Sequence, residues 1–453
     1  MLGLGLSELV PRLGLSELAP TMVYGLAFVV AFLALFYRSE IGILFISFFL
    51  PIYTVLNKAI QSELFLANQI VDVLLIAMLL GWIFQNKNIE DRRLGFAPLL
   101  IPILALMGYS LFSLFIGSSF LGETIFGESF NNRMAYWKNY MIMPVLYLVT
   151  YHNLRDRKWK YVLFGLIFVS LLISDFKFRQ TFRWVQHTHF MEESRVGGTL
   201  AFLGPNEWGS FHAIYNLFVL GLFLVDRNRW RRIIYLIVIL GSTYSLLYSF
   251  SRGAYFGFLI GLFFIGLIKS RKLLVVLIVF LLVWKFIVPV SVVERVTGTF
   301  VEQGERTSAI SVGDMEVDTV GRKELWEKAL NFFYQNPIVG TGFNTYHLMT
   351  GRDTHNVYLK TMAEQGLIGL LIYLTLYLCA IWSGWRLYRK ADEELVKALG
   401  FGFLCCTIGS IVANFFGDRW TYLQLGGFYW IFWGLVDQER RKIETKKITD
   451  NAN

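Results

Sequence analysis

The fold is decided by Trp208–Phe250, which reads WGSFHAIYNLFVLGLFLVDRNRWRRIIYLIVILGSTYSLLYSF. Two apolar runs in this stretch flank a short segment that holds Arg227, Arg229, Arg231 and Arg232. A helix needs about 20 mostly apolar residues to cross the hydrocarbon core of a membrane. Because lipid satisfies no backbone polar group, such runs must be helical. The stretch therefore predicts two membrane spans joined by a basic loop.

The composition extends this interpretation to the whole chain of 453 residues. Apolar residues make up 55% of it and charged residues 17%, whereas soluble domains carry about a quarter charged residues. The net charge is +9, but the basic residues form short clusters between apolar runs, which is typical of membrane topology and not of a nucleic-acid groove. We find no disulfide or zinc spacing among the three cysteines and no glycine-rich nucleotide loop, so no metal and no cofactor is expected.

We predict an all-α, polytopic transmembrane bundle of about 12 to 13 spans, formed by one integral membrane domain over residues 1–453. Residues 1–20 are left as an uncertain N-terminal segment. The candidate spans are Met22–Tyr37, Ile41–Leu56, Phe65–Phe84, Phe96–Ser119, Ala135–Tyr151, Trp159–Phe176, Trp208–Val225, Ile233–Phe250, Tyr255–Ile268, Leu273–Val290, Gly366–Leu387, Val396–Phe416 and Tyr422–Val436.

Basic clusters occur at every second loop, which assigns those loops to the cytoplasm by the positive-inside rule. Residues 437–453 then form a cytoplasmic tail, and a bacterial inner membrane fits this pattern best. The clusters are Lys87, Arg92 and Arg93; Arg155, Arg157, Lys158 and Lys160; Arg227, Arg229, Arg231 and Arg232; Lys269, Arg271 and Lys272; Arg386, Arg389 and Lys390; and Arg440, Arg441 and Lys442.

The remaining loops face outward, and two of them are long. One covers about residues 175–206, and the other covers residues 291–354 and is the largest polar segment of the chain. Connections without a function are usually short, so we expect the second loop to contribute to the function. Within it, residues 321–335 show apolar side chains at helical spacing and predict an amphipathic helix on the outer surface.

The segment that leaves the large loop is Thr354–Gly369, THNVYLKTMAEQGLIG. Its spacing predicts one helical stripe, with His355 in the first turn of the helix and with glycines that let a neighbouring helix approach. The positive end of a helix favours neutral imidazole, which can accept a proton from a hydroxyl. The alternative is a surface histidine that caps the helix. The stripe consists of His355, Leu359, Met362, Gly366 and Gly369.

This segment resembles the signature of the O-antigen ligase and polymerase family, a family of polytopic membrane glycan transferases: His355-Asn356, nine residues, then Gly366 and Gly369. Three further segments resemble the same family. They are the run from Gly321 through Asn336-Pro337 to Phe343, the run from Arg195 to Asn206-Glu207, and the turn Ser251-Arg252-Gly253-Ala254. The resemblance covers roughly residues 134–436.

Arginines on the outer side run against the positive-inside trend and therefore require an anionic partner. Arg252 lies between apolar runs, and Arg195 and Arg322 lie in the two long outer loops. A guanidinium binds phosphate through paired hydrogen bonds, so a lipid diphosphate is one such partner. Ion pairs with Glu193, Glu294 or Glu324 are the alternative. Arg133 and Arg183 lie on the same side.

The resemblance implies a fold like that of the membrane-embedded glycosyltransferases and metal-independent, inverting transfer of a glycan from a polyprenyl-diphosphate donor. It implies a lipid A–core or a second lipid-linked glycan as the acceptor, on the periplasmic face of the inner membrane. We expect His355 to act as the general base and Arg252, Arg195 and Arg322 to hold the diphosphate. Asn356, Asn206, Gly366 and Gly369 are expected to support the site.

Two other pairs of charged residues receive a structural interpretation. Lys360 and Glu364 are four residues apart and are expected to pair on the helix, and Asp418 with Arg419 is expected to form a structural pair in a short outer turn.

Two alternative functions remain open. A repeat-unit polymerase would share every motif with a ligase, whereas a lipid-linked glycan flippase would use the same arginines without chemistry.

Overall fold

The computed structural model describes residues 15–62, 64, 66–85, 97–182, 185–301 and 319–452. Helices make up 81% of the described residues, which contain no strand, so the predicted all-α fold class is confirmed. The first elements are α2 (Leu15–Phe36), α3 (Glu40–Phe49), α4 (Tyr53–Ile60), η1 (Ala67–Gln69), α5 (Ile70–Gln85), α6 (Leu100–Leu121) and α7 (Glu128–Asn153).

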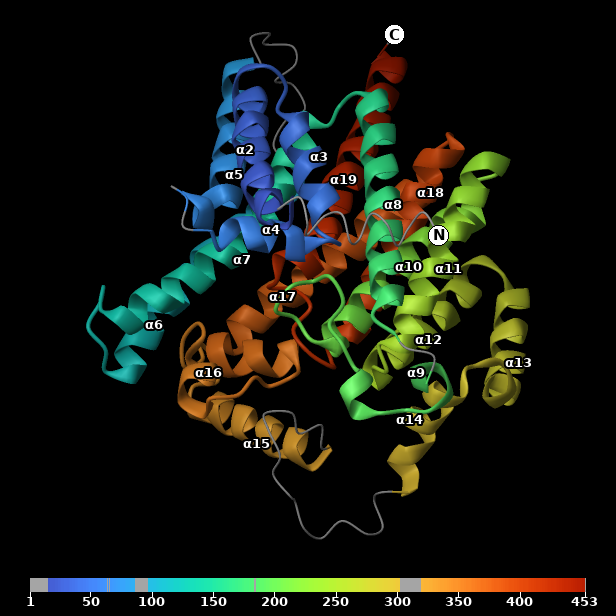
Figure 1. The fold of residues 1–453 in the computed structure, drawn as a ribbon. Coiled ribbons are helices and arrows are strands. Elements are labelled where there is room, and N and C mark those ends of the chain that lie inside the picture. The colour runs from blue at the N-terminus through green and yellow to red at the C-terminus, as the bar shows by residue number, and fades with distance from the viewer. Residues whose placement is uncertain are drawn as a thin grey trace.

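The middle of the chain forms α8 (Arg157–Gln180), α9 (Val185–Thr188), η3 (Glu192–Ser194), α10 (Pro205–Val225), α11 (Arg229–Tyr248), α12 (Arg252–Lys269), α13 (Arg271–Ile287) and α14 (Val290–Val301). The last part forms α15 (Thr319–Gln335), α16 (Thr345–Thr350), α17 (Val357–Lys390), α18 (Glu394–Ala413) and α19 (Leu423–Ala452). Figure 1 shows these elements in chain order from blue to red.

Within the described residues, eight helices are long and apolar enough to cross a membrane, or up to ten if each of two bent pairs is one span. The chain is therefore a polytopic helical membrane protein. The candidate spans that we placed in α2, α7 and α19 are not among these ten. Of these, α2 contributes only a shorter apolar helix, over Pro20–Phe36.

The candidate span that we expected over Ile41–Leu56 is bent, because α3 and α4 meet at an angle of 106°. A second bend of 106° separates α13 from α14. Pro51 lies in the first break and Pro289 in the second. Proline lacks the backbone donor that a continuing helix needs and clashes with the preceding turn, which explains both bends.

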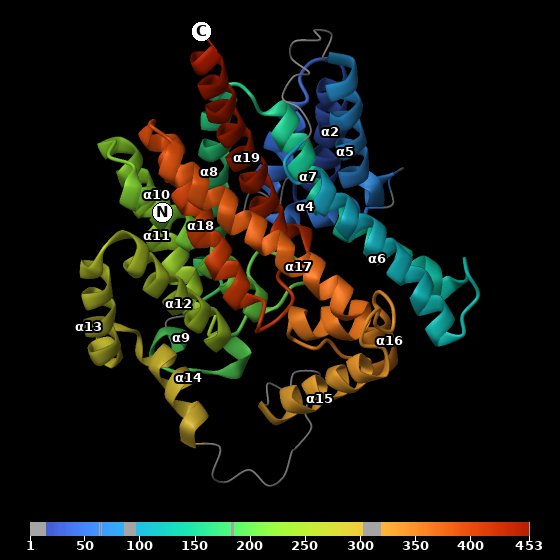
Figure 2. The same ribbon diagram turned by 180° about the vertical axis from the view of Figure 1, so that it is seen from behind.

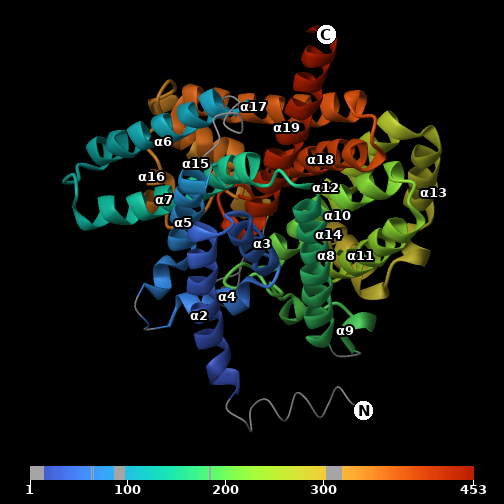
Figure 3. The ribbon, with the colours of Figure 1, turned by 90° about the horizontal axis from the view of Figure 1, so that it is seen from above.

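The most buried of the eight membrane helices is α10, with 83% of its apolar window buried inside the protein. It packs against α11, α12 and α18, while α17 packs against α18 and α19 against α7. The view from above places α10 in the middle of the molecule, with α6 and α13 on opposite flanks (Figure 3). The core therefore consists of helices that come from distant parts of the sequence.

The basic loops gather at one end of the bundle, which we call the basic end. Arg157 pairs with Glu393 at 2.6 Å, Arg227 with Glu394 at 3.4 Å and Arg386 with Glu444 at 2.9 Å. These pairs join the start of α8, the α10–α11 loop, the α17–α18 loop and α19. Figure 1 shows α9, α14, α15 and α16 at the opposite end.

Candidate functional site

His355 lies just outside the helix that we expected to contain it. The helix α17 begins at Val357, and Asn356 caps it by accepting hydrogen bonds from the backbone N–H groups of Tyr358 and Leu359. An N-cap residue is not itself helical, so the prediction that His355 occupies the first turn is wrong. His355 instead adopts a left-handed backbone conformation with φ of 50°. Such a conformation is uncommon for a residue other than glycine.

The loop that carries His355 is fixed on both sides. The Thr354 hydroxyl donates to the carbonyl of Asn356 at 2.8 Å, and the Trp326 indole donates to the carbonyl of Thr354 at 3.0 Å. The Val357 backbone N–H donates to the carbonyl of Asn414 at 3.0 Å. These bonds tie the loop to α15 and to the end of α18, and they hold the backbone around His355 in one place.

The imidazole of His355 is accessible and is held neutral. Its side chain is 46% exposed, and its Nδ1 atom lies 3.9 Å from Oδ2 of Asp353. Partial removal from water lowers the pKa of His355, and the charges of Arg322 and Arg419 lower it further, whereas Asp353 and Glu207 oppose this shift. A neutral, exposed imidazole can accept a proton from a hydroxyl group.

Arg322, on α15, lies in an unusually positive environment. Partial burial lowers the pKa of Arg322, and the neighbouring charges of Arg419, Arg252 and Arg195 lower it further, while Glu207 raises it. The charges of Arg195, Arg252 and Arg419 therefore all act on Arg322. Within the described part of the chain, no carboxylate lies within ion-pair distance of Arg322.

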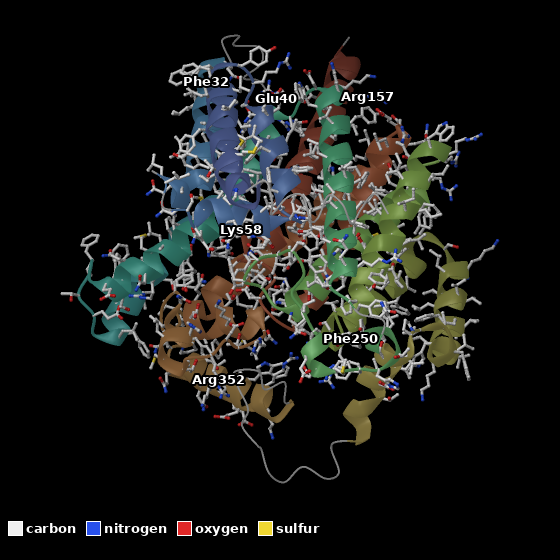
Figure 4. The ribbon with its side chains drawn as sticks, viewed as in Figure 1. Phe32, Glu40, Lys58, Arg157, Phe250 and Arg352 are labelled. Carbon is white, nitrogen blue, oxygen red and sulfur yellow. The ribbon has the colours of Figure 1, made fainter. Side chains whose placement is uncertain are left out.

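Arg252 is the first residue of α12, directly after the N-cap Ser251. The preceding Phe250 is fully buried and has φ of 51°, and Gly253 packs so closely on Phe416 that a Cβ atom would lie 2.8 Å away. These contacts fix the turn at the start of α12, where Arg252 is partly exposed. Figure 4 shows Phe250 and Arg352 at this end and Arg157 at the basic end.

Arg195 is more enclosed than the sequence suggested. Its side chain is 4% exposed and pairs with Glu192 at 2.6 Å, and it donates to Oδ1 of Asn206 at 2.9 Å. Asn206 therefore supports the cluster by holding this guanidinium. The ion-pair alternative holds for Arg195, but with Glu192 and not with Glu193.

The other two carboxylates that we proposed as partners of the arginines are engaged elsewhere. Glu294 contacts His189 at 3.3 Å, and Glu324 pairs with Lys328 at 2.6 Å. Neither forms an ion pair with a predicted arginine among the described residues.

Two arginines of the site were missed by sequence reasoning. Arg419 pairs with Glu207 at 2.5 Å and is 2% exposed. Arg295, on α14, pairs with Glu192 at 3.2 Å, is 13% exposed and interacts with the charges of Arg195 and Arg252. Both lie on segments that the alternation of basic loops assigns to the outer side, which is the signal that could have found them. We call Arg195, Arg252, Arg295, Arg322 and Arg419 the arginine cluster.

The two predicted structural pairs are wrong. Asp418 pairs with Lys360 at 3.2 Å. Arg419 contacts Asp418 only through the backbone carbonyl of Asp418, at 3.4 Å. Burial alone would raise the pKa of Asp418, but Lys360 and hydrogen bonds from Thr421 and Trp420 outweigh it and lower the pKa. Sequence spacing missed this contact because it joins α17 to the turn after α18.

Glu364 is buried and accepts hydrogen bonds from the backbone N–H groups of Asn344 at 3.0 Å and Tyr346 at 3.3 Å. These donors lie at the start of α16, whose first N–H groups have no partner within the helix. Glu364 therefore anchors α16 below the His355 loop.

Gly366 breaks α17 in two and does not continue the expected stripe. Its φ is 62° and its ψ is −161°, and a Cβ atom there would lie 2.3 Å from the carbonyl oxygen of Ile338. The backbone N–H of Leu367 donates to Pro337, and the N–H of Gly342 donates to the carbonyl of Glu364. The chain over 337–342 thus enters the break and satisfies the backbone groups that the break frees.

Gly369 is buried on the same helix, where a Cβ atom would lie 2.3 Å from Cβ of Gln365. The supporting role that we expect for Gly366 and Gly369 stays a prediction.

Arg133 lies outside the arginine cluster. Its side chain is fully buried, pairs with Glu123 at 3.0 Å and donates to the carbonyl of Leu114 and the hydroxyl of Ser118. It joins α6 to α7, as the ion-pair alternative expected. Arg183 lies outside the described residues.

The chain matches the family model described as O-antigen ligase over residues 236–374. This segment contains Arg252, Arg295, Arg322, His355 and Gly366, whereas Arg195 and Arg419 lie outside it. A comparison with curated proteins finds no match. The match over residues 236–374, on a polytopic helical membrane protein, supports an assignment to the O-antigen ligase and polymerase family.

Proposed function

We propose that the protein transfers a glycan from a polyprenyl-diphosphate donor to a hydroxyl group of an acceptor lipid. The observation that carries this proposal is the meeting of a neutral, exposed imidazole with the arginine cluster. The charges of Arg322 and Arg419 lower the pKa of His355, and those of Arg252 and Arg195 lower the pKa of Arg322. A proton acceptor beside an anion site is the arrangement that acyl- or glycosyl-type transfer from a phosphate leaving group needs.

The charge of the site suits a lipid diphosphate. Each diester phosphate carries about one negative charge, so the donor brings about two. Within the arginine cluster, Arg195 and Arg295 pair with Glu192, and Arg419 pairs with Glu207. The gathering of five guanidinium groups supports the binding of such an anion.

The arginines of the cluster differ in exposure, and we assign them different roles on that basis. Arg252 and Arg322 are partly exposed and can meet a ligand, whereas Arg195 and Arg419 are buried against carboxylates. We propose that Arg252 and Arg322 contact the diphosphate directly. Arg195, Arg295 and Arg419 raise the local positive potential and hold the walls of the site.

In the proposed step, the acceptor hydroxyl oxygen bonds to the anomeric carbon while the bond between that carbon and the diphosphate oxygen breaks. The electron pair leaves with the polyprenyl diphosphate, and the hydroxyl proton moves to the imidazole of His355. Attack from the side opposite the leaving group inverts the anomeric carbon. The guanidinium groups stabilise the charge that builds on the departing oxygen, which is a role that other transferases give to a metal ion.

The proposed location of the site is the periplasmic side of the bacterial inner membrane. The basic end, which carries Arg157, Arg227 and Arg386, would face the cytoplasm by the positive-inside rule, and the arginine cluster lies at the other end of the bundle. A lipid A–core acceptor would make the protein a ligase, and a second lipid-linked glycan would make it a polymerase. The site geometry suits both acceptors.

The test is transfer by the purified protein in proteoliposomes that contain the lipid-linked donor and either acceptor, with a metal chelator present. We expect the glycan on one acceptor together with release of polyprenyl diphosphate. The acceptor that is extended separates the ligase from the polymerase. Movement of intact donor across the bilayer without cleavage of the diphosphate linkage would contradict the proposal and indicate a flippase.

A further inference from the structure

A groove of 340 Å³ lies between α12, α17 and α18, on the side of these helices away from the core. All of its lining side chains are apolar, and Phe264 and Trp385 are 41% and 42% exposed. The groove is lined by Phe264 and Ile268 from α12, Ile381 and Trp385 from α17, and Ile408 and Val412 from α18, together with two further residues of α18. Nothing in the proposed chemistry uses this surface.

The three helices that form the groove also lead to the candidate site. α12 begins at Arg252, α17 begins two residues after His355, and α18 ends at Ala413, directly before Asn414. Asn414 accepts from the Val357 backbone N–H through its carbonyl and from the Arg419 N–H through its side chain. Figure 2 shows α12, α17 and α18 beside one another with α16 and α15 below. The groove and the site are therefore two parts of one three-helix face.

One row of side chains on α12 leads from the site into the groove. Residues four apart form a continuous ridge on a helix, and this ridge begins at a guanidinium and continues with apolar side chains. Every member of the row is at least partly exposed. At 1.5 Å per residue, Phe264 lies about 18 Å along the helix from the backbone of Arg252. The row consists of Arg252, Phe256, Ile260, Phe264 and Ile268.

We propose that the groove binds the prenyl tail of the donor and so selects donors by the length of that tail. This inference rests on the proposed function, in which Arg252 holds the diphosphate. A tail attached to a diphosphate at Arg252 can follow the exposed row past Phe256, which is 52% exposed, and reach Phe264 without crossing a polar side chain. A phospholipid whose head group lies elsewhere has no attraction to the guanidinium at the start of the row, so its chain is bound less tightly in the groove.

The test measures the affinity of the purified protein for undecaprenyl diphosphate and for geranyl diphosphate, whose chain is too short to extend from Arg252 to Phe264. Ile408→Trp fills the groove, and Phe264→Ala removes part of its wall without adding bulk. Leu378→Trp is the matched control, because Leu378 is 66% exposed on α17 and does not line the groove. Binding is measured without transfer, so the result does not depend on catalysis.

We expect both groove variants to weaken binding of undecaprenyl diphosphate about tenfold, which corresponds to about 1.4 kcal/mol. Their affinity for geranyl diphosphate and the affinities of Leu378→Trp should equal those of the wild type. Equal losses for both ligands, or no loss for either, would overturn the proposal, and the second result would indicate that bilayer lipid fills the groove. The groove variants can lose affinity for undecaprenyl diphosphate alone even though the wild-type protein transfers no glycan. That result would contradict the proposed function but support the assignment of the groove to the prenyl tail.

Discussion

Individual residues of the arginine cluster differ in how much freedom the fold leaves them. Arg195 and Arg419 are enclosed and each pairs with a carboxylate, so their charges act on the site from its walls. Arg252, at the start of α12, and Arg322, on α15, are partly exposed.

The first prediction concerns the geometry of the guanidinium group at position 252. Arg252→Lys keeps the charge but loses the paired hydrogen bonds, and hydrogen bonds to charged groups contribute about 1.5–3 kcal/mol. We therefore expect transfer efficiency, as kcat/KM for the donor, to fall about 10-fold to 100-fold. Arg227→Lys is the control, since Arg227 lies at the basic end and is 87% exposed. Full activity of Arg252→Lys would show that only the charge at position 252 is needed and not the paired hydrogen bonds of a guanidinium group.

The second prediction concerns the pH dependence of transfer. A general base works only when deprotonated, so activity should fall as the pH drops through the pKa of His355. The Asp353 carboxylate raises that pKa, whereas burial and Arg322 lower it. Asp353→Asn removes the raising influence and should move the acidic limb of the kcat/KM profile to lower pH, with activity at neutral pH largely retained. A limb that stays in place or moves to higher pH would exclude this arrangement.

At the scale of elements, the sequence indicated the membrane helices well but not their breaks. Apolar length predicted a span over Gly366–Leu387, yet the helix α17 starts at Val357 and breaks at Gly366. The break depends on the segment 337–342, which inserts its backbone there. A glycine in an apolar run is compatible both with helix packing and with a break, and only the tertiary contact decides between them.

The third prediction tests this break. Gly366→Ala places a Cβ atom against the carbonyl of Ile338 in a backbone conformation that costs about 1–3 kcal/mol for other residues. We expect a lower melting temperature in detergent. Gly108→Ala is the matched control, because a Cβ atom at Gly108 meets nothing within 4 Å. A Gly366→Ala protein that is as stable as Gly108→Ala would show that the break is not fixed as described.

For the whole molecule, the alternation of basic loops predicted which loops lie together at the basic end, and the ion pairs there agree with it. The sequence also placed His355, Arg195, Arg252 and Arg322 on one side. It could not predict that the charges of these residues act on one another, because the residues lie on segments that are far apart in the sequence. The same reason explains why Arg295 and Arg419 were missed.

The fourth prediction concerns sidedness. A cysteine at Arg352, which is exposed beside α16, should react with a membrane-impermeant maleimide added to intact spheroplasts. A cysteine at Arg227 should react only after the membrane is opened. The three native cysteines lie within α17 and α18, so their reaction should be slow. The reverse labelling pattern would place the site in the cytoplasm and remove its access to a periplasmic acceptor.

Transfer by His355→Ala, compared with His347→Ala, tests the central claim most directly. Both histidines are exposed and lie at the same end of the molecule, but His347 belongs to α16 and has no role in the proposed step. Loss of a general base typically costs 10²-fold to 10⁴-fold. We predict that His355→Ala binds the lipid-linked donor normally and loses transfer by about 100-fold or more, while His347→Ala transfers like the wild type. Near-normal transfer by His355→Ala would contradict the account.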